Sequence, residues 1–192
     1  MNLSSKTDIE KIITDCLKGN RNSQNLLFKF LYGKMMSVCM RYSENNSQAK
    51  DIFQEGMLKV FQNLNKYEFR GSFDGWAKRI FVNNAIDYLR KNKQYYNEFI
   101  DNSLYENIED DILNEIDNEE IPDIEHDKIL EYIQKLSPGY RTVFNLYIIE
   151  NYTHKQISEE LNIGIGTSKS NLAKAKIQLR NMLKKEFVKI GR

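Results

Sequence analysis

The sequence contains few of the residues that interrupt helices and few that form covalent or metal cross-links. Its 192 residues include only two prolines, nine glycines and two cysteines. So few helix breakers, together with the lack of any long run of alternating β-branched residues, favour an all-α protein. Cys16 and Cys39 are too few for a disulfide framework or a metal quartet, and such isolated thiols are typical of a reducing compartment.

Long apolar runs are missing as well. No run reaches the roughly 18 residues that a membrane-spanning helix requires, and the beginning, MNLSSKTDIEKIITDC, lacks the apolar core of a signal peptide. The two histidines, His126 and His154, have no neighbours in sequence that indicate a catalytic triad or a metal site, and no glycine-rich phosphate loop is present. The sequence therefore predicts a cytoplasmic protein that is not an enzyme and has no metal or cofactor.

Charge is balanced in total but divided along the chain. The protein has 28 Lys and Arg against 27 Asp and Glu, a formal net charge of +1. Residues 1–93 carry +7, residues 94–127 carry −13 without a single Lys or Arg, and residues 128–192 carry +7. Like charges at this density resist compaction. We therefore predict two small helical domains, 1–93 and 128–192, joined by a flexible acidic linker, 94–127.

The first domain is predicted to be a helical bundle. One helix begins at a Thr7 cap and ends at Gly19, and the next, residues 23–42, is apolar almost all round and therefore buried. Residues 47–64 place their apolar side chains on one face at helical spacing. The opposite face is polar except for Leu58. This face is either an ordinary solvated surface with one exposed leucine or a docking surface for a partner protein.

An aromatic and basic loop, residues 67–73, and a further helix beginning near Asp74 complete the first domain. One side of that helix is apolar, and the other combines cations, amides and an aromatic ring. Cations bind phosphates, amides can read base edges, and an aromatic ring can stack on an unpaired base. Nucleic-acid binding is favoured over a plain charged surface. The residues on this side are Trp76, Arg79, Asn83, Asp87, Arg90 and Lys91.

The second domain has the pattern of a helix-turn-helix. Ser137 and Pro138 begin one helix, Thr153 and Gln156 form a capping box at the start of another, and a third begins near Thr167 after the short turn NIGIG. In a helix-turn-helix the last helix lies in the major groove of DNA. The alternative is a plain three-helix bundle with a basic final helix. The residues predicted to face DNA are Thr167, Lys169, Ser170, Asn171 and Lys174.

Three segments, in this order, resemble a bacterial RNA polymerase sigma factor of the extracytoplasmic-function group. DIFQEGMLKVF is similar to the polymerase-binding helix of that family, FRGSFDGWAKRIFVNNAIDYLRK to its promoter-melting segment, and LSPGYRTVFNLYIIENYTHKQISEELNIGIGTSKSNLAKAKIQLR to its promoter-binding helix-turn-helix. The resemblance covers almost the whole chain. It implies a protein that binds core RNA polymerase, recognises the −35 and −10 elements of promoter DNA and promotes DNA opening for transcription initiation. It also implies an anti-sigma protein as a further partner.

The resemblance assigns a role to each of these surfaces. Residues implied to dock on the clamp of the largest polymerase subunit are Asp51, Gln54, Glu55 and Leu58. Residues implied to contact the −10 element, with a flipped base received by the 67–73 loop, are Tyr67, Phe69, Arg70, Ser72, Phe73, Trp76, Arg79, Asn83 and Asn84. Residues implied to read the −35 element are Thr167, Lys169, Ser170, Asn171 and Lys174.

Some positions depart from the family pattern. Gly56 lies inside the polymerase-binding helix, where glycine costs up to about 1 kcal/mol relative to alanine. Ser168 replaces an apolar residue on the inner face of the last helix, Asn83 stands where a basic residue is frequent, and Asn171 and Ala173 replace residues that are often Arg and His. These differences leave the exact −35 contacts open.

Two other functions and the purpose of the linker also remain open from the sequence. A repressor or activator would use the helix-turn-helix without being a polymerase subunit. A helical adaptor would bind a protein, without the salt dependence of phosphate contacts. The linker is either a solvated spacer or a polyanion that occupies the RNA path of the polymerase or shields the two basic domains.

Overall fold

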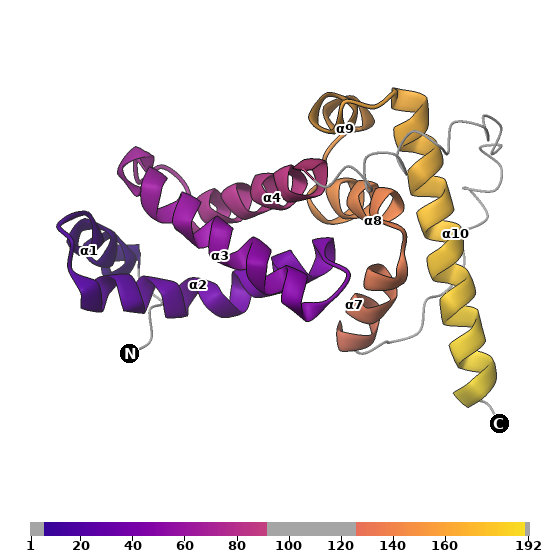
Figure 1. Cartoon of the computed structure of the whole chain (residues 1–192), viewed down its shortest axis with the longest axis horizontal. Helices are drawn as coiled ribbons and strands as arrows, with labels where there is room; N and C mark the ends of the chain where they lie inside the picture. The colour runs from indigo at the N-terminus through magenta and orange to yellow at the C-terminus, as the bar shows by residue number, and fades with distance from the viewer. Residues whose placement is uncertain (1–5, 92–125, 191–192) are drawn as a thin grey trace. The chain divides into compact units, whose positions relative to one another are not determined.

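The structure, a computed structural model, describes residues 6–91 and 126–190. Every secondary-structure element in these two stretches is helical (Figure 1), which confirms the predicted all-α class. The chain divides into two compact units, Met1–Tyr88 and Leu89–Arg192. We consider each unit by itself. The predicted flexibility of the acidic linker concerns residues outside those described, apart from its last two.

Residues 6–91 form four α-helices and one 3-10 turn, and the last of these helices ends three residues beyond the first unit. α1 ends before Gly19, which has a φ of +80°. The side chain of Asn20 then accepts a hydrogen bond from the backbone N–H of Ser23 and caps α2. Thr7 lies inside α1 and is not its cap, contrary to the prediction. The elements are α1 (Lys6–Leu17), α2 (Arg21–Tyr42), α3 (Asn46–Asn63), η1 (Leu64–Lys66) and α4 (Phe73–Lys91).

The crossing of α3 and α4 explains the glycine in the middle of α3. A Cβ atom at Gly56 would lie 2.5 Å from Cδ1 and Cε1 of Phe81, whose ring is fully buried. The same ring stacks on Phe53 with 5.4 Å between centroids. Gly56 is therefore the residue that lets the two helices approach closely. Gly33, by contrast, has open space around it, and α2 runs through it unbroken.

Within residues 126–190, the first helix of the second unit is α7 and the last is α10, the longest helix that the structure describes (Figure 1). The capping box of Thr153 and Gln156 is present at the start of α9, as predicted. α10 begins at Ile165, two residues before the predicted Thr167. Its elements are α7 (His126–Lys135), α8 (Pro138–Phe144), the π-helical turn η3 (Asn145–Ile149), α9 (His154–Leu161) and α10 (Ile165–Ile190).

A fully buried arginine connects α8 to α7. Arg141 Nη1 donates hydrogen bonds to the backbone oxygens of Gln134, at 2.8 Å, and Leu136, at 3.3 Å. These carbonyls lie at the C-terminal end of α7, where a positive charge is favourable. Next to this arginine, Tyr140 of α8 and Ala175 of α10 form an apolar core with Leu136.

Candidate nucleic-acid interface

The predicted polymerase-binding residues lie together on the outward face of α3. Asp51, Gln54 and Leu58 are exposed, and Glu55 is half-buried. Leu58 is 61% exposed, the largest fraction for any large apolar side chain that the structure describes. The face is therefore an apolar side chain surrounded by polar ones, on a helix whose opposite side is buried.

The aromatic loop is packed against itself. The ring centroid of Tyr67 lies 5.2 Å from those of Phe69 and Phe73 and 5.4 Å from that of Trp76. Tyr67 Oη donates to the backbone oxygen of Gly71 at 3.1 Å, and burial raises the pKa of this phenol. Phe69 and Gly71 both have a positive φ, which is uncommon for a residue other than glycine. Tyr67 and Phe73 are thus internal supports, while Phe69 and Trp76 remain half-exposed.

The remaining predicted −10 residues differ in exposure. Arg70 and Ser72 in the loop and Arg79 and Asn83 on α4 are exposed. Ser72 also has a structural role, since its Oγ accepts a hydrogen bond from the N–H of Gly75 at 3.1 Å and so supports the first turn of α4. Arg79 and Asn83 are one turn apart on α4, so both are available to a strand that lies along it.

Asn84 does not lie on the surface, contrary to the prediction that it contacts DNA. Its side chain is fully buried, and its Nδ2 donates to the backbone oxygen of Ile52 on α3 at 2.9 Å. The family resemblance implied this contact, and Asn84 was not among the residues that helical spacing placed on the polar side of the helix; α3 covers it. Asn84 therefore joins the two helices.

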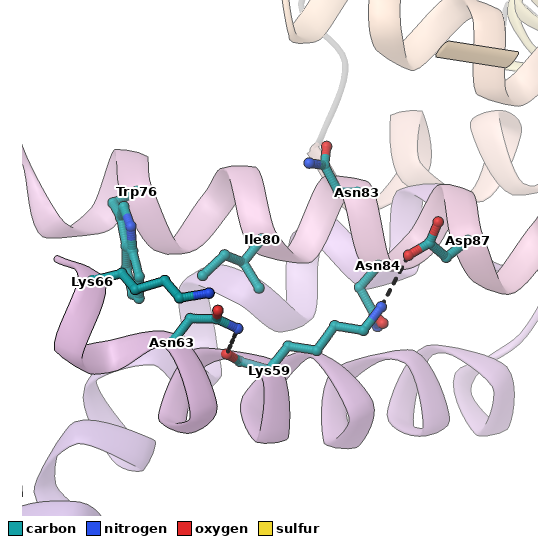
Figure 2. Close-up of a pocket in the computed structure, with 8 residues that line it drawn as sticks. All are labelled: Lys59, Asn63, Lys66, Trp76, Ile80, Asn83, Asn84 and Asp87. Carbon is teal, nitrogen blue, oxygen red and sulfur yellow. Dashed lines mark hydrogen bonds and ion pairs between the residues drawn. The ribbon is translucent and has the colours of Figure 1, made fainter.

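A groove of about 310 Å³ lies between α3 and α4 (Figure 2). Lys59 crosses it, with its Nζ 3.0 Å from Asp87 Oδ2 and 3.8 Å from Glu55 Oε1. Figure 2 shows Trp76 and Lys66 at one end of the groove and the pair of Lys59 and Asp87 at the other. The lining residues are Lys59, Asn63, Lys66, Trp76, Ile80, Asn83, Asn84 and Asp87.

Sequence reasoning missed the half of this groove that α3 and η1 supply. Lys59, Asn63 and Lys66 follow each other at helical spacing on one side of the chain, and this spacing is the signal that could have found them. Helical spacing within α3 separates an apolar face from an opposite polar face, to which Lys59 belongs. Lys59, Asn63 and Lys66 line a groove only because α4 lies beside them.

In the second unit, a polar contact joins the two helices of the helix-turn-helix. His154 Nδ1 lies 2.9 Å from Ser168 Oγ, and the imidazole stacks on Tyr147 with 4.5 Å between ring centroids. Burial, and then the charge of Lys169, lower the pKa of His154. The serine that departs from the family pattern thus has a partner at its buried position. The turn between the helices contains Asn162 with a φ of +53°.

The predicted −35 residues are not equally accessible. Lys169 is exposed, and Thr167, Ser170 and Lys174 are half-buried. Asn171 is 1% exposed, and its two polar side-chain atoms have no hydrogen-bond partner among the described residues. Its predicted contact with DNA is therefore not available in this conformation, because it faces the interior.

Comparison with protein families assigns both units. The model of sigma-70 region 2 matches residues 27–95, and the model of sigma-70 region 4 matches residues 126–179. The two matches follow each other in the predicted order and together include well over half of the chain. The chain belongs to the sigma-70 family.

Known relatives place this sigma factor in the extracytoplasmic-function group, which confirms the resemblance seen in the sequence. It is 29% identical to the ECF RNA polymerase sigma factor SigW of Bacillus subtilis, over 92% of this chain and 97% of that protein. It is 28% identical to the ECF RNA polymerase sigma factor SigE of Mycolicibacterium smegmatis, over 79% of this chain and 58% of that protein. Among solved structures, the sigma factor RpoE of Bartonella quintana, in complex with the anti-sigma factor NepR, is similar with a TM-score of 0.48 and 16% identity, over 83% of this chain and 96% of that one.

The protein is therefore an RNA polymerase sigma factor for promoter recognition, and sigma factors in general are not enzymes. Within residues 6–91 and 126–190, no group of three His, Cys, Asp or Glu side chains could hold a metal ion. None of the helices described is long and apolar enough to cross a membrane.

Proposed function

We propose that this sigma factor binds core RNA polymerase through the outward face of α3. Leu58 is the apolar centre of that face, and Asp51, Gln54 and Glu55 surround it. Interfaces commonly place an apolar side chain at the centre of a polar rim. The close packing of Gly56 on Phe81 keeps this face rigid, which lowers the entropy lost on docking.

The −10 element is proposed to bind along α4 and the loop before it. Arg70, Arg79 and Asn83 are exposed, and half-exposed Phe69 and Trp76 offer ring faces on which unpaired bases can stack. Each stacked base is worth about 1–3 kcal/mol. Capture of unpaired bases on these rings supplies free energy for DNA opening. Tyr67 and Phe73 act in this proposal as supports for the other two rings.

The −35 element is proposed to bind at the start of α10. Lys169 is the exposed cation there, and Thr167, Ser170 and Lys174 keep partial exposure. Residues 169–192 carry eight Lys and Arg against one acidic residue, so phosphate binding and its salt dependence are expected. Asn171 contributes through the packing of α10 and not through a base contact. The proposed site of action is the cytoplasm, without any catalysis by this chain.

The observation that supports this proposal best is that three surfaces follow each other along the chain in one order. The outward face of α3 comes first, the exposed side of α4 second, and the helix-turn-helix of the second unit third. In vitro transcription with the purified full chain and core polymerase tests it. We expect promoter-directed transcripts that depend on both proteins. Tight duplex binding by the chain alone, with no transcript from any cellular promoter, would instead support a repressor or activator.

Substitution of Leu58 by alanine tests the docking face. We expect affinity for core polymerase to fall about five-fold or more, because hot-spot side chains contribute more than about 1 kcal/mol. Leu17→Ala on α1 is the matched control, since Leu17 is 50% exposed on another part of the same unit. Both variants should melt at the temperature of the wild type. Equal affinities of the two variants for core polymerase would show that Leu58 does not belong to the interface.

A further inference from the structure

A titratable side chain joins η3, α9 and α10, and the proposed −35 contacts do not use it. His154 is the first residue of α9, which packs against both η3 and α10. Its Nδ1 lies 2.9 Å from Ser168 Oγ on α10, and its ring stacks on Tyr147 of η3. Ser168 is fully buried, whereas the imidazole is half-buried. The ring is therefore held by contacts on two elements while part of its surface stays open to solvent.

The groups around His154 favour its neutral form in the free protein. Burial lowers the pKa of the imidazole, and the positive charge of Lys169 on α10 lowers it further. On α9 itself, Lys155 is the next residue, and a cation is unfavourable at the N-terminal end of a helix. The nearest carboxylates in the sequence do not outweigh these effects, since the pKa is lowered overall. They are Glu150 at the end of η3 and Glu159 and Glu160 on α9.

DNA bound to α10 removes one of these effects. Lys169 is the exposed cation of the proposed −35 surface, and it directly follows Ser168, the partner of the imidazole. A phosphate held by Lys169 neutralises the charge that disfavours a protonated His154. The first helix of a helix-turn-helix crosses the DNA backbone, so α9 approaches phosphates as well. A nearby negative charge favours the charged form of an imidazole.

We propose that binding of α10 to the −35 element is coupled to the uptake of one proton by His154, which acts as a positioning residue of this interface. In the charged imidazole both ring nitrogens donate, so Nδ1 donates to Ser168 Oγ. This hydrogen bond keeps the start of α10 fixed to α9, and the new charge joins that of Lys169 opposite the DNA backbone. The inference rests on the proposed function, because the −35 element must bind at the start of α10.

The coupling has a defined sign. The pKa of His154 is lowered in the free chain and is expected to be higher in the DNA complex, so the affinity for DNA rises as pH falls. Stability depends on pH in the opposite direction, because the unfolded chain takes up the proton before the folded free chain does. The same proton therefore lowers the stability of the free second unit and raises its affinity for DNA. A histidine with only a structural role would not produce this opposition.

The first test follows the two protonation states directly. The full chain has two histidines, His126 and His154, so their Cε1–H signals in proton NMR can be assigned with the variants His126→Gln and His154→Gln. The wild-type chain is titrated with and without an excess of a duplex that covers the −35 region of a mapped promoter. We expect the pKa of His154 to be higher with the duplex bound and that of His126 to change much less.

The second test measures the affinity of the holoenzyme for the same promoter DNA at about pH 7.5 and 5.5 and at one ionic strength. Core polymerase and DNA titrate identically with wild type and His154→Gln, so a difference between their pH dependences belongs to His154. We expect the gain at low pH to be about three-fold or more larger for the wild type, because one pKa unit corresponds to about ten-fold over a complete titration. His126→Gln, at the start of α7, should retain the wild-type dependence. Melting curves of both variants at about pH 7.5 show whether the fold is preserved.

The outcomes separate this inference from the function on which it depends. If the wild-type holoenzyme starts transcription correctly but the pKa of His154 is unchanged or lower with the duplex bound, no proton is taken up and the inference is wrong. Equal pH dependences of the wild type and His154→Gln lead to the same conclusion. If the wild type yields no promoter-directed transcript, the proposed function itself is wrong, and the inference is wrong with it.

Discussion

The two units of this sigma factor stabilise their interiors in different ways. In the first unit the centre is mostly apolar, and the tightest contact is the Phe81 ring against the backbone of Gly56. In the second unit Arg141 and Ser168 are fully buried, and Asn171 nearly so. Close packing is sensitive to volume, whereas buried polar groups are sensitive to the loss of a partner. The first unit should therefore respond to changes of shape and the second to changes of hydrogen bonding and pH.

The largest effect should come from the buried arginine of the second unit. In Arg141→Met, the carbonyls of Gln134 and Leu136 lose their donor, and each buried unsatisfied group costs about 1–3 kcal/mol. We expect the free energy of unfolding of this unit to fall by about 2–5 kcal/mol in urea titrations followed by circular dichroism. Arg70→Met, at a side chain of the first unit that is 88% exposed, should change the free energy of unfolding of its own unit by less than about 0.5 kcal/mol. An Arg141 variant as stable as the wild type would show that the second unit does not depend on its polar interior.

A smaller effect is expected from added volume in the first unit. Gly56→Ala places a methyl group against the Phe81 ring, and overpacking of this kind costs about 1–3 kcal/mol. Gly33→Ala has open space and should stabilise the protein by about 0.5–1 kcal/mol through helix propensity alone. Thermal melts of the two variants, which carry the same chemical change, should shift in opposite directions. Shifts in the same direction would mean that the crossing at Gly56 is not tightly packed.

The smallest effect concerns pH and only the second unit. The pKa of His154 is lowered in the folded protein, so the unfolded chain binds the proton first as pH falls. The stability from neutral His154 is complete above the ordinary value of about 6.5 and is lost as pH drops toward the folded pKa. We expect a small decrease in the melting temperature of the second unit between pH 7.5 and 5.5. His154→Gln should show a weaker decrease, and an equal decrease would exclude His154 as its source.

Local patterns in the sequence predicted much of this molecule. Helical periodicity identified the outward face of α3 and the exposed residues Arg79 and Asn83 of α4. The capping box of Thr153 and Gln156 was also predictable, because caps depend on residues three positions apart. Each of these features depends on residues of a single helix. Which of those residues share a face follows from the helical repeat of 3.6 residues per turn.

Features that depend on a second helix could not be predicted in this way. Asn171 was predicted to face outward, but it lies in the core of the helix-turn-helix unit. The family resemblance implied that Asn84 contacts DNA, but α3 covers it. From the sequence, Gly56 is predicted only to destabilise α3, because the contact that requires it comes from Phe81 on α4. The groove could not be predicted for the same reason, because its lining combines Lys59 of α3 with residues of α4.

The contact between Gly56 and Phe81 also has a consequence for how the protein can change in evolution. Leu58 and Lys59 are successive residues of α3, so their side chains diverge by about 100°. One points outward and the other crosses the groove to Asp87. Any inserted or deleted residue between Gly56 and this pair would rotate both side chains by that angle, because the anchored helix cannot turn to compensate. This stretch of α3 should therefore accept substitutions but no change of length.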